Sequence, residues 1–242
     1  MHDELLRLMI NFKLCYEIPR SLGKYIAPQL LSANQPSYDW NETNNLILRY
    51  TYEFMPKGII TQFIVVMHEL INEQKCVWKS GVILSKDQTK AEVIEYYDKR
   101  EIKIRVAGHH KRDLMTIVTH ELDKIHDSYN KRLKYNKLIP CNCHTCKDSQ
   151  EPHFYSFEIL RKFVADKQES IQCQKSYQMV DALGLIDVMN RREFLKIEQQ
   201  KEGDFLSNYS EVKNHNVVVT INNVIQPSKQ ENNFMTESSK QQ

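Results

Sequence analysis

A run of alternating side chains at positions 46–54 is the feature that most limits how this chain can fold. Its apolar side is formed by Leu46, Leu48, Tyr50, Tyr52 and Phe54, and polar residues lie opposite most of them. Alternation with a period of two is typical of a β-strand with one buried face. The strand therefore needs neighbouring strands and a covering layer.

Further strands and helices are predicted on both sides of this segment. Three strands follow in quick succession at 76–84, 91–97 and 101–107, and a last one is predicted at 133–139. The short polar turns that join the first three favour antiparallel pairing. Apolar residues at helical spacing predict helices at 59–71 and 110–129.

The order of these elements predicts an α+β fold, an antiparallel sheet with helices packed on one face. We expect four regions along the chain. They are a helical segment and linker at 1–40, an α+β module at 41–139, a cysteine hook with a helical extension at 140–190, and a mostly flexible tail at 191–242. The tail is rich in Asn, Gln, Ser and Lys, apart from a strand-like run at 217–221.

Composition and charge exclude several classes of partner. The chain has 33 basic and 31 acidic residues, a net charge of +2, and the two signs are interleaved. This gives no electrostatic case for nucleic acid as the main partner. No apolar run approaches the ~20 residues that span a bilayer. Asp3 and Glu4 stand where a signal peptide has basic residues, so we expect a cytoplasmic protein without a transmembrane segment.

Motifs for catalysis are absent from the sequence. None of the six glycines forms a phosphate-binding loop, so we expect no nucleotide to be bound by this chain. The pair His120 and Glu121 suggests a zinc protease, but the next histidine, His126, is six residues away instead of four. Residues six apart do not share a helical face. A metal-dependent hydrolase therefore stays a remote alternative, and we predict no catalytic residues.

Cysteines at the end of the α+β module predict a metal site. Cys141, Cys143 and Cys146 lie in one loop, and Cys173 follows at a distance. Four thiolates can close a tetrahedral shell with no open position, which is typical of structural zinc. One structural zinc is the cofactor that we expect. Two alternatives stay open: His144 or His153 as the fourth ligand, or reduced thiols without a metal.

Several segments together resemble the COR (C-terminal of Roc) region of Roco-family proteins. They are LRYTYEFMPKG at 48–58, VWKSGV at 77–82, IKIRV at 102–106, PCNC at 140–143 and QEPHFY at 150–155. The resemblance implies a module that follows a Ras-like Roc GTPase domain. In that family the first half of COR packs on the GTPase, and the second half, which residues 45–139 resemble, is the main site of homodimerisation.

The function predicted from this resemblance is a non-catalytic regulatory and homodimerisation module of a Roco-type GTPase protein. Its partners would be a second copy of the chain and a Roc-type GTPase domain in cis or in trans. Interface candidates are the aromatic residues Tyr50, Tyr52, Trp78, Tyr96 and Tyr97, with the core as the alternative place for each. The alternative function is a stand-alone, zinc-stabilised protein-binding module unrelated to GTPase signalling.

Overall fold

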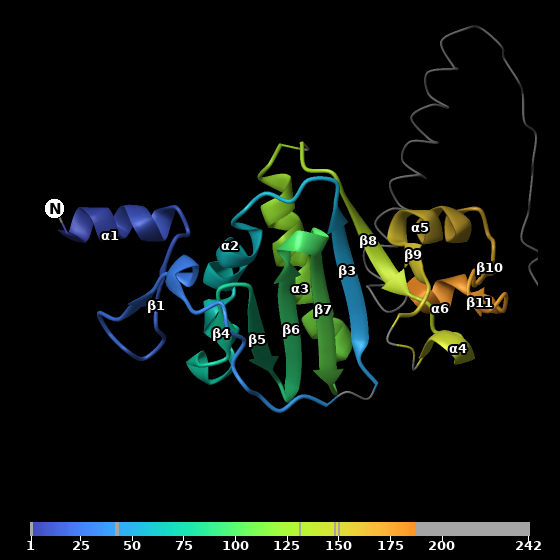
Figure 1. Cartoon of the computed structure of the whole chain (residues 1–242), viewed down its shortest axis with the longest axis horizontal. Helices are drawn as coiled ribbons and strands as arrows, with labels where there is room; N and C mark the ends of the chain where they lie inside the picture. Colours follow the sequence, from blue (N-terminus) through green and yellow to red (C-terminus); the bar gives the residue numbers. More distant parts are fainter. Residues whose placement is uncertain (1, 42–43, 131, 148, 150, 187–242) are drawn as a thin grey trace, which may run out of the picture. The chain divides into compact units, whose positions relative to one another are not determined.

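A seven-stranded antiparallel sheet forms the centre of the structure, a computed structural model (Figure 1). The structure describes residues 2–41, 44–130, 132–147, 149 and 151–186, all within one compact unit, Met1–Phe194. In sheet order the strands are β4 (Val77–Trp78), β5 (Gly81–Lys86), β6 (Thr89–Tyr96), β7 (Glu101–Gly108), β3 (Leu46–Tyr52), β8 (Tyr135–Pro140) and β9 (Phe154–Ser156).

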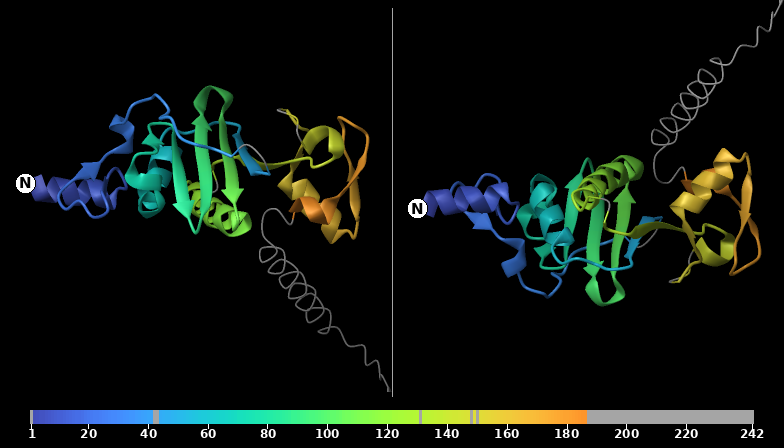
Figure 2. Two further views of the ribbon diagram at one scale, coloured as in Figure 1. Left: turned by 90° about the horizontal axis from the view of Figure 1, so that it is seen from below. Right: turned by 90° about the horizontal axis from the view of Figure 1, so that it is seen from above.

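Two helices, α2 (Ile59–Val66) and α3 (Lys111–Asp127), cover one face of this sheet (Figure 2). The side chains between the two layers are almost fully buried, among them Leu48, Tyr50, Ile104, Phe63 and Leu122. This architecture confirms the predicted α+β class. It also explains the strand alternation, because every second residue of β3 points at the helices.

The remaining elements lie before and after the sheet. Before it come α1 (His2–Asn11), β1 (Tyr16–Glu17), β2 (Tyr25–Ile26) and the 3₁₀ turn η1 (Pro28–Leu30). Further 3₁₀ turns are η2 (His68–Leu70), η3 (Asn72–Gln74) and η4 (Tyr97–Lys99). After β8 come α4 (His144–Lys147), α5 (Phe157–Ala165), β10 (Ser170–Gln172), β11 (Met179–Asp181) and α6 (Ala182–Ile186). The predicted tail, 191–242, lies outside the described residues, and none of the described helices is long and apolar enough to cross a membrane.

The prediction of a single strand at 76–84 was wrong, because the chain reverses in its middle. Trp78 ends β4 and pairs with Gly81 at the start of β5. A β-carbon on Gly81 would lie 2.3 Å from Cζ2 of Trp78. The turn therefore depends on a glycine that lets the indole ring lie flat against the backbone.

The other face of the sheet is partly covered by the segment that precedes β3. Tyr38 and Trp40 from this segment pack on a small second core of Cys76, Trp78, Ile83 and Ile94. Of the five aromatic residues predicted as interface candidates, Tyr50, Tyr52 and Trp78 are buried in the two cores, while Tyr96 and Tyr97 are exposed. Only these last two remain available for contact with another molecule.

A carboxylate from the sheet caps the start of α2. The residue before this helix is Gly58, which has no side chain to accept a hydrogen bond from the first amides. The Glu95 carboxylate of β6 accepts one from the backbone N–H of Ile60 instead. Burial outweighs this bond and raises the pKa of Glu95 to about 7.

Replacing the buried Leu122 by Ala should lower the free energy of unfolding by about 2–5 kcal/mol, because the substitution leaves a cavity between α3 and the sheet. The matched control is Leu22→Ala, at a side chain that is 96% exposed, where the change should stay within about 0.5 kcal/mol. Urea unfolding of the two variants measures the difference. Equal losses would contradict the assigned core.

Glu95 should make the protein less stable as pH rises from 4.5, the ordinary pKa of the group, to about 7. The pKa of Glu95 is higher in the folded state than in the unfolded state. Protonated Glu95 therefore stabilises the fold at low pH, and this stabilisation is lost as pH rises to about 7. Glu95→Gln should flatten this part of the pH dependence, and the exposed Glu69→Gln should leave it unchanged. Unfolding free energies on either side of the window test this.

Candidate metal centre

Four cysteine side chains from two separate segments meet beside the edge of the sheet. Cys141 follows β8, Cys143 lies in the next loop, Cys146 lies in α4, and Cys173 follows β10. Their Sγ atoms all lie within 4.8 Å of one another, and all four residues are buried. All six cysteines of the chain are described, and each is a free thiol. The four that converge could hold a metal ion.

The spacing of the thiols suits a tetrahedral ion. Sγ of Cys146 lies 3.7 Å from Sγ of Cys173. Zinc–sulfur bonds of about 2.3 Å in a tetrahedron put the sulfurs about 3.8 Å apart. The donors are all thiols, the set that soft or borderline cations such as zinc prefer.

Backbone hydrogen bonds shape the two segments that carry the cysteines. The Cys141 amide donates to the His153 carbonyl oxygen at 2.7 Å, which joins the loop to the residues that enter β9. The Cys146 amide donates to the Cys143 carbonyl oxygen at 3.0 Å and closes the turn into α4. The Tyr177 amide donates to the Cys173 carbonyl oxygen at 2.7 Å, in the turn between β10 and β11.

Hydrogen-bond donors also surround the sulfur atoms. The amide of Cys143 lies 3.4 Å from Sγ of Cys141, and the amide of His153 lies 3.4 Å from Sγ of Cys146. The Ser176 hydroxyl lies 3.3 Å from Sγ of Cys143. Donors of this kind stabilise thiolates. They would therefore favour the thiolate form of these cysteines, which is the form that binds a metal ion.

The pKa values of the thiols divide into two groups. Burial raises the pKa of Cys141 to about 12 and also raises that of Cys146. At Cys173 burial is outweighed by hydrogen bonds from Ser176 and the Lys175 amide, and the pKa falls to about 6. The Ser176 hydroxyl lowers the pKa of Cys143. Four crowded thiolates need a cation to balance their charge.

The two histidines considered as alternative ligands lie outside this group of four. His144 is exposed, and the His153 ring packs edge-on against Tyr155, with the centroids 4.6 Å apart. The residues that sequence reasoning missed are Ser176, Lys175 and Tyr155, which surround the sulfurs. Ser176 comes three residues after Cys173, and this short spacing was the available sequence signal for a tight turn beside a ligand residue.

The histidines of α3 form no shared site with Glu121. His120 is exposed and His126 is 2% exposed, as the six-residue spacing predicted. His126 lies in a buried cluster, with Nε2 2.8 Å from the Tyr52 hydroxyl and Nδ1 3.9 Å from Asp123. Burial opposes ionisation of Asp123, but the neighbouring His126 and Lys137 lower its pKa. Nε2 of His126 has the Tyr52 hydroxyl as its partner, whereas Nδ1 is buried and forms no hydrogen bond with the described residues.

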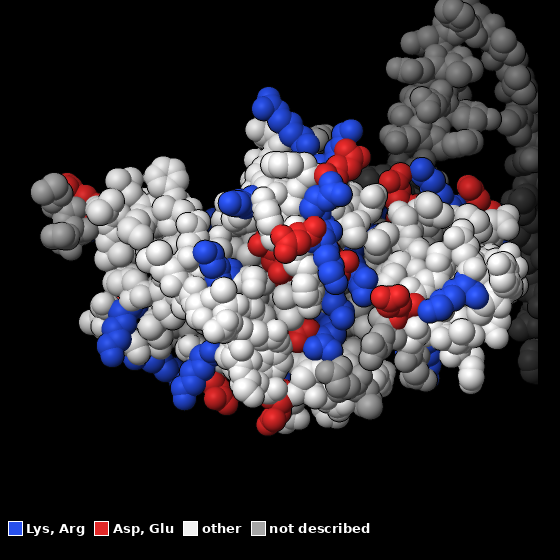
Figure 3. Space-filling view, in the orientation of Figure 1, with Lys and Arg blue, Asp and Glu red and all other residues white. Residues whose placement is uncertain are grey.

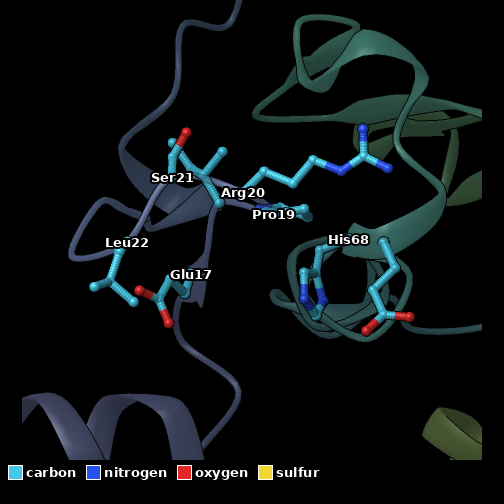
Figure 4. A pocket seen from close by; sticks show the side chains of 8 residues that line it. Glu17, Pro19, Arg20, Ser21, Leu22 and His68 are labelled. Carbon is cyan, nitrogen blue, oxygen red and sulfur yellow. The ribbon is translucent and has the colours of Figure 1, made fainter.

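A pocket of about 670 Å³ lies between the residues that follow β1 and the turn η2 (Figure 4). The Glu17 carboxylate accepts a hydrogen bond from the Gly23 amide at 2.7 Å. Nδ1 of His68 lies 2.8 Å from the Val65 carbonyl oxygen. Arg20 points away from Glu17 (Figure 4). Because its polar groups bond to the backbone or diverge, the pocket is a weaker candidate than the cysteine cluster.

Comparison with known families matches residues 43–188 to the domain described as C-terminal of Roc, COR-B. The match includes the whole sheet and all four converging cysteines. This chain belongs to the COR-B family. It is thus a COR region of a Roco-family protein, and the COR region is a non-catalytic part of those proteins.

Two curated relatives come from Dictyostelium discoideum. The COR-B chain is 22% identical over 159 residues to the probable serine/threonine-protein kinase roco5. The aligned region covers 61% of this chain and 6% of that protein. It is 26% identical over 159 residues to the probable serine/threonine-protein kinase pats1, over 58% of this chain and 5% of that protein. The chain thus spans a small part of the relatives that it matches.

Proposed function

We propose that this COR-B chain is a regulatory and homodimerisation module of a Roco-type GTPase protein. The observation that carries the proposal is the COR-B match over residues 43–188, which spans the sheet, its covering helices and the cysteine cluster. The names of the relatives roco5 and pats1 support the same family context. The GTPase partner would be a Roc-type domain in cis or in trans.

We assign a separate role to each of three regions predicted from the sequence. Residues 41–139 would pair with a second copy, 140–190 would form a metal-held extension, and 1–40 would correspond to the end of the first COR half. A change in the GTPase would alter how two modules pair, and pairing would in turn bias the GTPase. This reciprocity is what thermodynamic linkage requires.

The proposed pairing surface includes the exposed aromatic residues beside the turn between β6 and β7. Tyr96 and Tyr97 are 37% and 42% exposed. Lys99 lies over the Tyr96 ring and Lys57 over the Tyr97 ring, at 5.6 and 5.9 Å from the centroids. Exposed tyrosines are among the residues enriched at protein interfaces, and the two lysines make cation–π contacts with their rings.

The proposed cofactor is one structural zinc held by Cys141, Cys143, Cys146 and Cys173. Supporting observations are the mutual approach of the four Sγ atoms within 4.8 Å, their burial and the all-thiol donor set. When bound, zinc would cross-link the loop after β8 to the turn after β10. A closed shell of four ligands leaves no position for substrate, in keeping with a structural role.

Light scattering across a dilution series should show a concentration-dependent dimer of the chain. Tyr97→Ala should raise the dimer dissociation constant about tenfold, as expected for an aromatic residue at an interface. The matched control is Tyr177→Ala, at a tyrosine that is 74% exposed in the extension, which should leave the constant unchanged. A monomer at every concentration would contradict homodimerisation and favour the stand-alone binding module.

The purified chain should contain about one zinc ion, because four thiolate ligands complete one shell. Cys173→Ser should lose most of the metal, while Cys76→Ser, at a buried cysteine outside the cluster, should keep it. Metal analysis of both variants tests the assignment, and chelation should make the region 140–190 more susceptible to proteolysis. Equal zinc content in the two variants would exclude Cys173 as a ligand.

A further inference from the structure

Like charges face each other at the centre of the sheet, on the side away from α2 and α3. Arg49 of β3 is the direct cross-strand partner of Lys103 of β7. Arg105 follows two residues later on the same face of β7. We call these three residues the basic band. Like charges opposite each other on neighbouring strands destabilise a sheet, so the band costs stability in the chain by itself.

Nearby acids balance the basic band only in part. Arg105 donates to both oxygens of the buried Glu92, at 2.5 and 2.7 Å. Glu101 lies 3.5 Å from Nε of Arg49. Among the described residues no carboxylate pairs with Lys103, and its pKa is lowered by burial and by the charges of Arg105 and Arg49. Lys103 is therefore the cation of the band that lacks a paired carboxylate of its own among the described residues.

Aromatic rings hold the two guanidinium groups at the ends of the band. Arg105 lies over the Trp40 ring at 5.1 Å, and Arg49 lies over the Phe154 ring at 4.2 Å from the centroid. Figure 3 shows Lys and Arg side chains in a band over this face, with acidic side chains beside them. Stacked arginines lose less conformational freedom when they bind a carboxylate.

The geometry of the band fits an extended chain. Lys103 and Arg105 are alternate residues of one strand, and such residues lie about 7 Å apart. Alternate side chains of an extended ligand have the same spacing. The chain's own segment with Tyr38 and Trp40 already packs on the neighbouring part of this face, where the Tyr38 hydroxyl donates to Glu92 at 2.5 Å.

We propose that the basic band is a docking site for an acidic segment of a partner protein, with carboxylates at alternate positions. The segment would lie along β7 and place a carboxylate at Lys103, beside Arg49 and Arg105. Carboxylates match guanidinium groups in charge and in planar geometry. The proposal requires neither dimerisation nor zinc, although Tyr96 of the proposed pairing surface is the cross-strand partner of Glu101, the acid beside Arg49.

The test uses the full chain and a labelled peptide in which Glu alternates with Ser, followed by fluorescence anisotropy. Lys103→Gln should weaken binding about tenfold, the effect of one lost charged contact. Lys24→Gln, at an exposed lysine away from the band, should leave binding unchanged. Binding should weaken as salt is raised. Lys103→Gln should not destabilise the fold, because it removes the repulsion with Arg49, and urea unfolding checks this.

Several results would overturn the proposal. A peptide with Gln in place of Glu that binds equally well would exclude charge recognition. If Lys103→Gln and Lys24→Gln weakened peptide binding equally, the attraction would come from the overall charge of the chain and not from a specific site. Binding of inorganic phosphate at the band, without binding of the peptide, would assign a phosphate site instead. A change in dimer mass for Lys103→Gln without a change in peptide binding would identify a second copy as the occupant.

Discussion

The antiparallel register between β3 and β7 is the constraint on which the rest of the structure depends. Pairing Leu48 with Ile104 and Tyr50 with Ile102 places these side chains under the helices. The same register places Arg49 opposite Lys103 on the other face. A slip by one residue would exchange the two faces and bury the cations. The hydrophobic layer therefore determines where the charged surface lies.

The edge of the sheet joins this charged surface to the cysteine cluster. Strand β8 pairs with β3 and then leads directly into Cys141, while β9 pairs with β8. The hydrogen bond from the Cys141 amide to His153 lies at the entry to β9, which carries Phe154 against Arg49. An ion in the cluster would thus brace the strand that supports one end of the basic band.

Polar groups inside the core have a structural explanation. The Tyr50 hydroxyl donates to Asp123 at 3.0 Å, and Lys137 donates to the other oxygen of the same carboxylate at 2.5 Å. A buried carboxylate without such partners would cost several kcal/mol. These bonds connect α3 to β3 and β8 across the layer.

The amino-acid sequence by itself determined the order of the main strands and of the two helices that cover them, but not the reversal between β4 and β5. Alternation at 46–54 and 101–107 and the helical stripes at 59–71 and 110–129 are local patterns. Local backbone geometry converts them into β3, β7, α2 and α3, although β3 ends at Tyr52 and α2 at Val66. It also placed three cysteines in one loop, because C-x-C-x-x-C spacing is short enough for the thiols to approach. The COR resemblance rested on the same segments.

Only the tertiary structure decided which distant residues meet. Sequence patterns predicted Cys173 as the fourth ligand but left His144 and His153 open as alternatives, and the packing of the β10–β11 hairpin places Cys173 beside the cysteine loop. They did not show that Gly81 reverses the strand under Trp78, or that Arg49 faces Lys103. Periodicity reports which face of an element is buried. Pairing between elements depends on long-range packing, which no single segment encodes.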